Sequence, residues 1–94
     1  MSAAPLFALG QIVSTPGALD ALQEEGTNGL ELLRRHVTGD WGDLSEDDKR
    51  ENDLSVKEGF RILSAYLLPR TGVKLWIITE ADRSVTTFLL PSEY

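Results

Sequence analysis

The sequence predicts an α+β fold, in which about three N-terminal helices are followed by an antiparallel β-meander of three to four strands. Two observations lead to this prediction. Before residue 59, apolar side chains recur at helical spacing between residues that start and stop helices. After it, short runs rich in β-branched and aromatic residues alternate with polar turns. The 94 residues, 41% of them hydrophobic, can bury one small core, so we expect a single domain over residues 1–94.

The chain begins with an apolar run over residues 6–14, which we expect to be a strand. If it joins the sheet as an edge strand, the sheet has four strands. Thr15 and Pro16 then start a helix, because proline is favoured at the first helical position. This helix is expected to end near residue 25, where a glycine follows, and to turn Leu19 and Leu22 inward.

A second helix is predicted over residues 29–37, with Thr27 or Asn28 as its cap. His36, the only histidine, falls at its C-terminal end, where the helix dipole favours a cation. It is therefore either a capping residue or, with partners from the sheet, a general acid or base. The apolar stripe of this helix is Leu30, Leu33 and Val37.

Ser45 caps a predicted third helix that ends at Gly59. Only Leu54 and Val56 are apolar within it, so it cannot bury a wide face. We expect it to lie on the surface or to turn a polar face toward a partner, a face that includes Asp48, Asn52 and Ser55.

Three strands follow, over residues 60–68, 73–80 and 85–90. Four-residue turns between them pair Leu68 with Val73 and Glu80 with Val85. Alternation then assigns one face to Phe60, Ile62, Ser64, Tyr66, Leu68, Val73, Leu75, Ile77, Thr79, Thr86, Phe88 and Leu90. The other face carries Arg61, Leu63, Ala65, Leu67, Lys74, Trp76, Ile78, Glu80, Val85, Thr87 and Leu89.

Both faces are largely apolar, so both need cover. The first two helices can cover one face. We therefore predict that a second subunit covers the other, in a C2 homodimer. Arg61 lies opposite Glu80, as a cross-strand ion pair or an anion-binding residue.

The first face also gathers four hydroxyl groups among its apolar neighbours. They are either strand residues whose hydroxyls bond to backbone or water, or a polar patch that orients a ligand in a groove. The candidate groove residues are His36, Arg61, Ser64, Tyr66, Thr79 and Thr86.

Composition excludes several kinds of chemistry. With no cysteine and one histidine, we expect no disulfide, no metal site and no bound cofactor. The sequence has no glycine-rich phosphate loop, nucleophile motif or calcium loop, and we predict no catalytic residue. No apolar run is long enough to span a membrane and no signal peptide is evident, so a cytoplasmic protein is expected.

Negative charge is concentrated in one segment of a chain whose net charge is −6. Residues 39–59 hold eight acids and three bases, which makes nucleic-acid binding there unfavourable. The segment is either a solvated helix face or a surface that binds a protein. Trp41, between two glycines, is either a lid over the core or an exposed anchor. The candidate partner-binding residues are Asp40, Trp41, Asp43, Asp47, Asp48, Glu51 and Asn52.

Three stretches, residues 36–43 (His-Val-Thr-Gly-Asp-Trp-Gly-Asp), 59–66 and 76–94, resemble a family of small uncharacterised bacterial proteins. These occur on plasmids, phages and chromosomal islands, and are often labelled plasmid-related or type I restriction enzyme subunit. The resemblance implies an accessory of mobile elements and no established activity.

At the level of fold alone, helices before an antiparallel sheet also resemble barnase and RelE-like ribonucleases. That resemblance implies roles for His36, Arg61, Tyr66 and Thr86, while the acidic charge disfavours it. The sequence thus favours a non-enzymatic interaction protein that binds an unknown protein partner. The alternatives are a ribonuclease-like toxin or its relic, and an inhibitor of a defence nuclease whose acidic surface imitates DNA.

Overall fold

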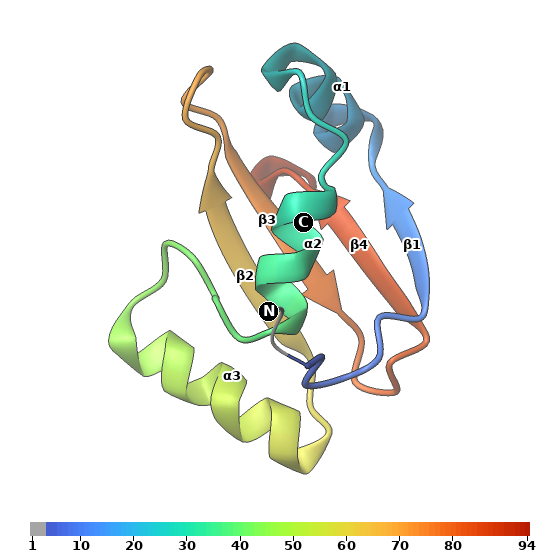
Figure 1. Cartoon of the computed structure of the whole chain (residues 1–94), viewed down its shortest axis with the longest axis vertical. Coiled ribbons are helices and arrows are strands. Elements are labelled where there is room, and N and C mark those ends of the chain that lie inside the picture. The colour runs from blue at the N-terminus through green and yellow to red at the C-terminus, as the bar shows by residue number, and fades with distance from the viewer. Residues whose placement is uncertain (1–3) are drawn as a thin grey trace.

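A computed structural model describes residues 4–94 and confirms the α+β class (Figure 1). As predicted, one strand precedes the helices, although it begins at Gln11 and not at residue 6. The elements are β1 (Gln11–Ser14), α1 (Pro16–Glu25), α2 (Leu30–Val37), α3 (Glu46–Glu58), β2 (Ile62–Leu67), β3 (Lys74–Thr79), β4 (Val85–Leu89) and a short 3₁₀ helix η1 (Pro91–Glu93).

The sheet is mixed, so the predicted antiparallel meander is wrong in one strand. The strand order is β1-β4-β3-β2, and β1 pairs in parallel with β4, with Gln11 opposite Val85. Gly10 makes this pairing possible, because its φ is +65° and a Cβ there would lie 2.3 Å from the carbonyl oxygen of Ser84. No turn links β1 to β4, so hairpin reasoning did not give its direction.

The registers predicted for the two hairpins are confirmed. Tyr66 pairs with Leu75 and Thr79 with Thr86, as the predicted turns require. Most of the first predicted face is buried, whereas Phe60, which was assigned to it, precedes β2 and is 56% exposed. The members that are at most 3% exposed are Ile62, Ser64, Tyr66, Leu68, Leu75, Ile77, Thr79, Thr86 and Phe88.

The helix ends are mostly as predicted. Thr15 and Ser45 cap α1 and α3, and Gly26 and Gly59 end them in the left-handed conformation. The predicted cap of α2 is wrong: its N-cap is Gly29, at φ +83°, which approaches the Phe88 ring too closely for a side chain.

The prediction of which residues of the first two helices face inward is correct for only some of them. Leu22 and Leu33 are buried, whereas Leu19 and Leu30 are 49% and 62% exposed. Each helix is rotated so that another side chain takes the core position. These side chains are Ala18 in α1 and His36 in α2.

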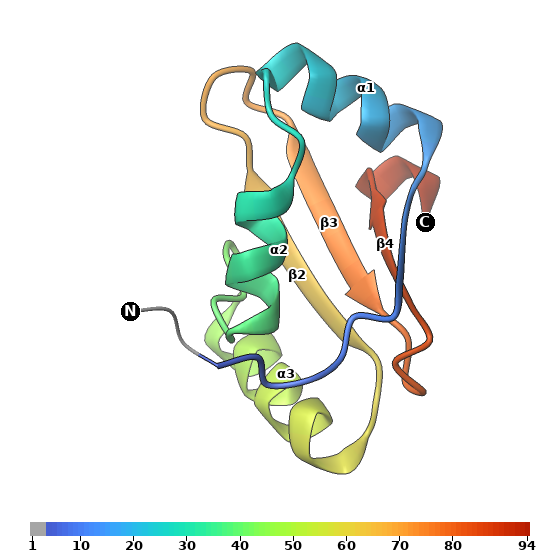
Figure 2. The same cartoon turned by 45° about the vertical axis from the view of Figure 1, so that its right-hand side comes forward.

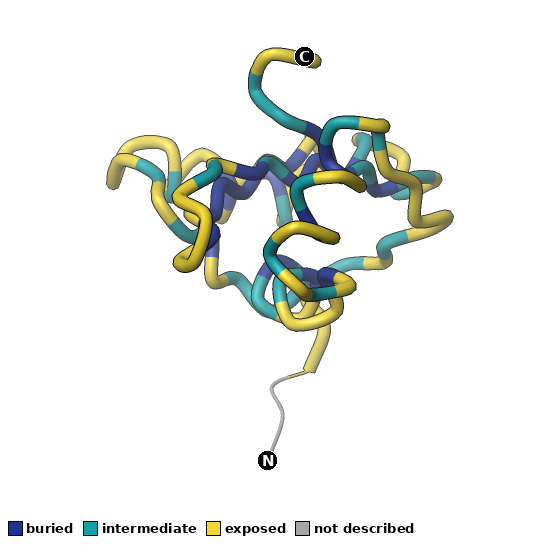
Figure 3. The backbone as a smooth tube through the Cα atoms, turned by 90° about the horizontal axis from the view of Figure 1, so that it is seen from above, coloured by how far each residue is buried: buried dark blue, intermediate teal, exposed yellow. Residues whose placement is uncertain are grey.

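Helices α1 and α2 lie over the same face of the sheet, and α3 lies beside the sheet edge that β2 forms (Figure 2). The core forms between the two helices and the strands, and in Figure 3 the buried segments gather there while the loops are exposed. Its buried residues are Ala18, Leu22, Leu33, Tyr66, Leu75, Ile77 and Phe88.

The second sheet face is covered in part by the chain's own C-terminal end. The rings of Trp76 and Tyr94 meet edge to face at 5.7 Å, and Arg61 lies over the Tyr94 ring and donates to its hydroxyl. No Arg61–Glu80 ion pair forms among residues 4–94. On this face Ala65, Ile78 and Leu89 are buried within the single chain, whereas Leu67 is 57% exposed.

Candidate functional site

Four of the candidate groove residues form one hydrogen-bonded chain inside the core. His36 Nδ1 lies 2.5 Å from Ser64 Oγ, and its Nε2 lies 2.9 Å from Thr79 Oγ1. Thr79 Oγ1 is 2.7 Å from Thr86 Oγ1, which donates to the Leu9 carbonyl oxygen at 2.7 Å. All four residues are 0% exposed, so they do not line a groove. Helices α1 and α2 cover the face on which they lie.

The direction of each bond in this chain follows from its last member. Because Thr86 uses its hydroxyl hydrogen on Leu9, Thr79 must be the donor between the two threonines. An uncharged imidazole has one ring hydrogen, so His36 Nε2 donates to Thr79 and Nδ1 accepts from Ser64. The histidine is therefore satisfied on both nitrogens, and no group is left over to take or give a proton. Among the described residues, no buried side-chain nitrogen or oxygen lacks a partner.

Two aromatic rings close over His36. The Trp41 and Phe7 ring centroids lie 6.0 and 5.2 Å from the imidazole, both edge to face. Trp41 is 4% exposed, and its indole N–H donates to Asp53 at 3.0 Å. Trp41 is therefore the lid of the core and not an exposed anchor for a partner.

Burial, and after it the charge of Arg83, lower the pKa of His36 to about 3. In the unfolded chain it returns to 6.5, so unfolding takes up a proton between these values. Stability is thus complete above pH 6.5 and falls by roughly 1.4 kcal/mol per pH unit below it. Urea unfolding should show a loss of about 1.4 kcal/mol from roughly pH 7.5 to pH 5.5, a range in which carboxyl groups of ordinary pKa stay about nine-tenths ionised. A His36→Gln variant should be flat there, and an equal slope in both proteins would contradict this assignment.

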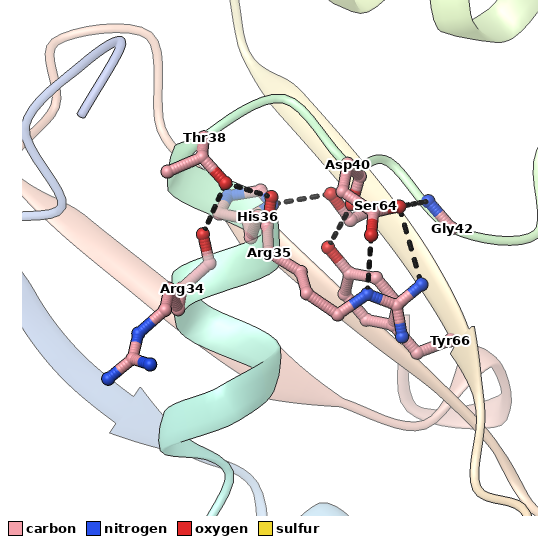
Figure 4. A network of polar contacts seen from close by, with 8 residues as sticks. All are labelled: Arg34, Arg35, His36, Thr38, Asp40, Gly42, Ser64 and Tyr66. Atoms are coloured by element: carbon pink, nitrogen blue, oxygen red, sulfur yellow. Dashed lines mark hydrogen bonds and ion pairs between the residues drawn. The ribbon is translucent and has the colours of Figure 1, made fainter. Parts of the chain in front are cut away.

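Asp40 and Tyr66 fasten the loop after α2 to the sheet (Figure 4). The Tyr66 hydroxyl donates to the Asp40 carbonyl oxygen at 2.6 Å, and Arg35 lies 4.6 Å above the Tyr66 ring. Arg35 Nε also donates to the Asp40 carboxylate at 2.7 Å. This bond lowers the pKa of Asp40, and burial raises that of Tyr66 to about 12. Asp40 is therefore occupied within its own chain rather than free for a partner.

Asn52 also serves its own chain. Its side-chain amide donates to the Leu63 carbonyl oxygen at 2.7 Å and accepts from the Leu63 N–H at 3.2 Å, as a neighbouring strand would. Next to it, two backbone bonds hold the loop to Ala65. The Ala65 N–H donates to the Trp41 carbonyl oxygen at 3.1 Å, and the Asp43 N–H donates to the Ala65 carbonyl oxygen at 2.6 Å. The outer edge of β2 is thus closed by α3 and the preceding loop. Of the polar α3 face that was expected to meet a partner, Asn52 meets β2 instead and Ser55 is buried, while Asp48 stays exposed.

A hollow of about 430 Å³ opens between α3 and the second face of the sheet. We call it the acidic groove. Its floor is apolar, and its rim is mainly carboxylate. The lining residues are Asp43, Leu44, Asp48, Glu51, Asn52, Leu63, Ala65, Lys74 and Trp76. Four of these were predicted as partner-binding residues: Asp43, Asp48, Glu51 and Asn52. Leu63, Lys74 and Trp76 were missed, although their alternation had placed them on this face.

The acids of residues 39–59 differ in whether a cation already holds them. The ion pairs are Arg35–Asp40, Lys74–Asp43, Lys49–Glu46 and Arg50–Asp47. Asp48 and Glu51, one helical turn apart on the groove rim, make no ion pair with any residue of the described chain. The groove rim therefore holds carboxylates open to an external cation, beside the half-buried Trp76 and an aliphatic floor that would pack against the stem of a cationic side chain.

The other predicted site residue, Arg61, lies on the second face against Tyr94, away from His36. Among residues 4–94, no helix has both the length and the apolar character of a membrane span, and no group of three or more ligating side chains could hold a metal ion. The chain matches no protein-family model, no curated protein and no solved structure. The resemblance to plasmid- and phage-related proteins therefore stays a prediction.

Proposed function

We propose that this is a non-enzymatic interaction protein whose acidic groove binds a basic, amphipathic segment of another protein. The observation that carries the proposal is the pair Asp48 and Glu51, left without a cation above an apolar floor. A lysine or arginine side chain suits both parts, because its stem is apolar and its end is charged.

The two alternatives have less support. A ribonuclease would need His36, Tyr66 and Thr86 to reach a substrate, but they are at most 1% exposed. A surface that imitates DNA needs a row of uncompensated charges, and four acids of the segment are already paired. A role in mobile elements, a cytoplasmic location and a homodimer remain part of the proposal.

The proposal is tested with a fluorescein-labelled peptide of alternating lysine and leucine, followed by anisotropy. Removing both open charges in Asp48→Asn/Glu51→Gln should weaken binding at least fivefold, corresponding to roughly 1 kcal/mol. The matched control, Glu46→Gln/Asp47→Asn, removes the same charge from the same helix outside the groove lining, and should change affinity less than about twofold.

Equal weakening in the two variants would show that only the net charge attracts the peptide, and would overturn the groove as a site. If the unmodified protein does not bind the peptide at low salt, the proposal is also overturned.

A further inference from the structure

The two edges of the sheet are treated differently by the fold. The β2 edge is closed by Asn52 and by the loop through Trp41 and Asp43. The β1 edge is open: β1 is the last strand in the order, and all its residues are exposed (Figure 1). An open strand edge presents unpaired backbone groups to another chain.

The parallel pairing decides which backbone groups of β1 point outward. Gln11 N–H donates to Ser84 and Thr15 N–H donates to Phe88, so the odd-numbered residues face β4. By alternation, the N–H and carbonyl groups of Ile12 and Ser14 face away from the sheet.

Apart from its length of four residues, β1 carries none of the usual protections of an edge strand. Gln11–Ser14 contains no charged residue and no proline, which are the usual protections of an edge strand. Ile12 and Val13 are 43% and 37% exposed. Two copies that each carry a charge of −6 repel one another over most of their surfaces, so a neutral strip is where they can approach. A foreign basic strand, in contrast, would find no carboxylate on β1.

From this geometry we infer that two copies of the chain pair through their β1 edges, antiparallel about a two-fold axis at Val13. This register lets Ile12 exchange both backbone hydrogen bonds with the partner's Ser14, and Ser14 with the partner's Ile12. Moving the axis to Ile12 would call on Gly10, which turns away at φ +65°, and moving it to Ser14 would call on Pro16, which has no N–H. The inference gives the proposed homodimer a surface and does not depend on the acidic groove.

The interface is short, so the dimer should be weak and depend on concentration. Sedimentation equilibrium from roughly 5 µM to about 500 µM should show the mass rising from 10.4 kDa toward twice that value. Val13→Lys and Val13→Glu place like charges opposite one another at the axis, and each variant alone should stay monomeric. Mixed together, they should form a heterodimer, because the axis then pairs lysine with glutamate.

Gln11→Lys is the charge-matched control, since Gln11 lies opposite the partner's Thr15 in this register and the variant should still dimerise. If the Val13 variants do not fold by circular dichroism, Ile12→Pro removes only an outward N–H and should also abolish the dimer. A wild-type mass of one chain throughout the range would overturn the inference. So would dimers that persist in Ile12→Pro or in the separate Val13 variants, or a mixture of the two Val13 variants that stays monomeric.

Discussion

Alanine in place of His36 is expected to lower the free energy of unfolding by about 3–5 kcal/mol, near half of the total for a domain of this size. The substitution leaves a cavity under Trp41. It also removes the acceptor of the Ser64 hydroxyl and the N–H that donates to Thr79, which keeps only its bond to Thr86. Urea unfolding at pH 7, followed by circular dichroism, measures the loss.

Arg34→Ala is the matched control, since Arg34 lies on the same helix with its side chain 66% exposed and should cost less than about 0.5 kcal/mol. A His36→Ala protein as stable as this control would mean that the buried hydrogen-bonded chain contributes little, and that His36 is kept for some other purpose.

The second large effect is expected at Gly42. A Cβ at this position would lie 2.0 Å from the Ala65 carbonyl oxygen and 2.7 Å from the Tyr66 ring. Gly42→Ala should therefore push the loop off the β2 edge and cost about 3 kcal/mol or more, by the same urea measurement.

Gly59→Ala separates this contact from backbone strain. Gly59 has the same φ of +79°, with nothing within 4 Å of its Cβ position, so only the left-handed conformation is penalised, at about 1 kcal/mol. Equal losses at the two glycines would show that the loop yields and that its closeness to β2 is unimportant.

The parts of the fold that were predicted correctly are those set by short-range chemistry. The turns before Val73 and Val85 fixed two registers, and Ser45 and Gly59 fixed the ends of α3. β1 was predicted as a strand that would lie at an edge, but its parallel direction is seen only in its pairing with β4, between distant parts of the chain that no local pattern reports.

The candidate site divides in the same way. Alternation correctly placed Ser64, Thr79 and Thr86 on one face. Whether their hydroxyls line a groove or lie in the core depends on what covers that face. His36 follows Leu33 by three residues and so shares its inward stripe, a signal that was outweighed by its position at the helix end. Hydroxyl groups that looked like a ligand patch are the partners of a buried histidine.

For the acidic segment, charge pattern pointed to the right region but not to the right residues. Asp40, Trp41 and Asn52 are polar or large groups on a surface segment, and each instead holds the chain together. The distinction between a paired and an open carboxylate depends on Arg35, Lys74 and other cations that approach through the fold. Of the acids predicted to bind a partner, we propose that role only for Asp48 and Glu51, on the rim of the acidic groove.

The most direct test uses the two tryptophans, because Trp76 lines the acidic groove and Trp41 is buried against the core. Each indole N–H gives a separate signal in a ¹H–¹⁵N spectrum, recorded while the lysine–leucine peptide is added. A groove that binds the peptide should shift the Trp76 signal together with the amides of Asp48 and Glu51, and leave the Trp41 signal in place. Saturable shifts that spare Trp76 and gather elsewhere on the molecule would contradict the proposed function.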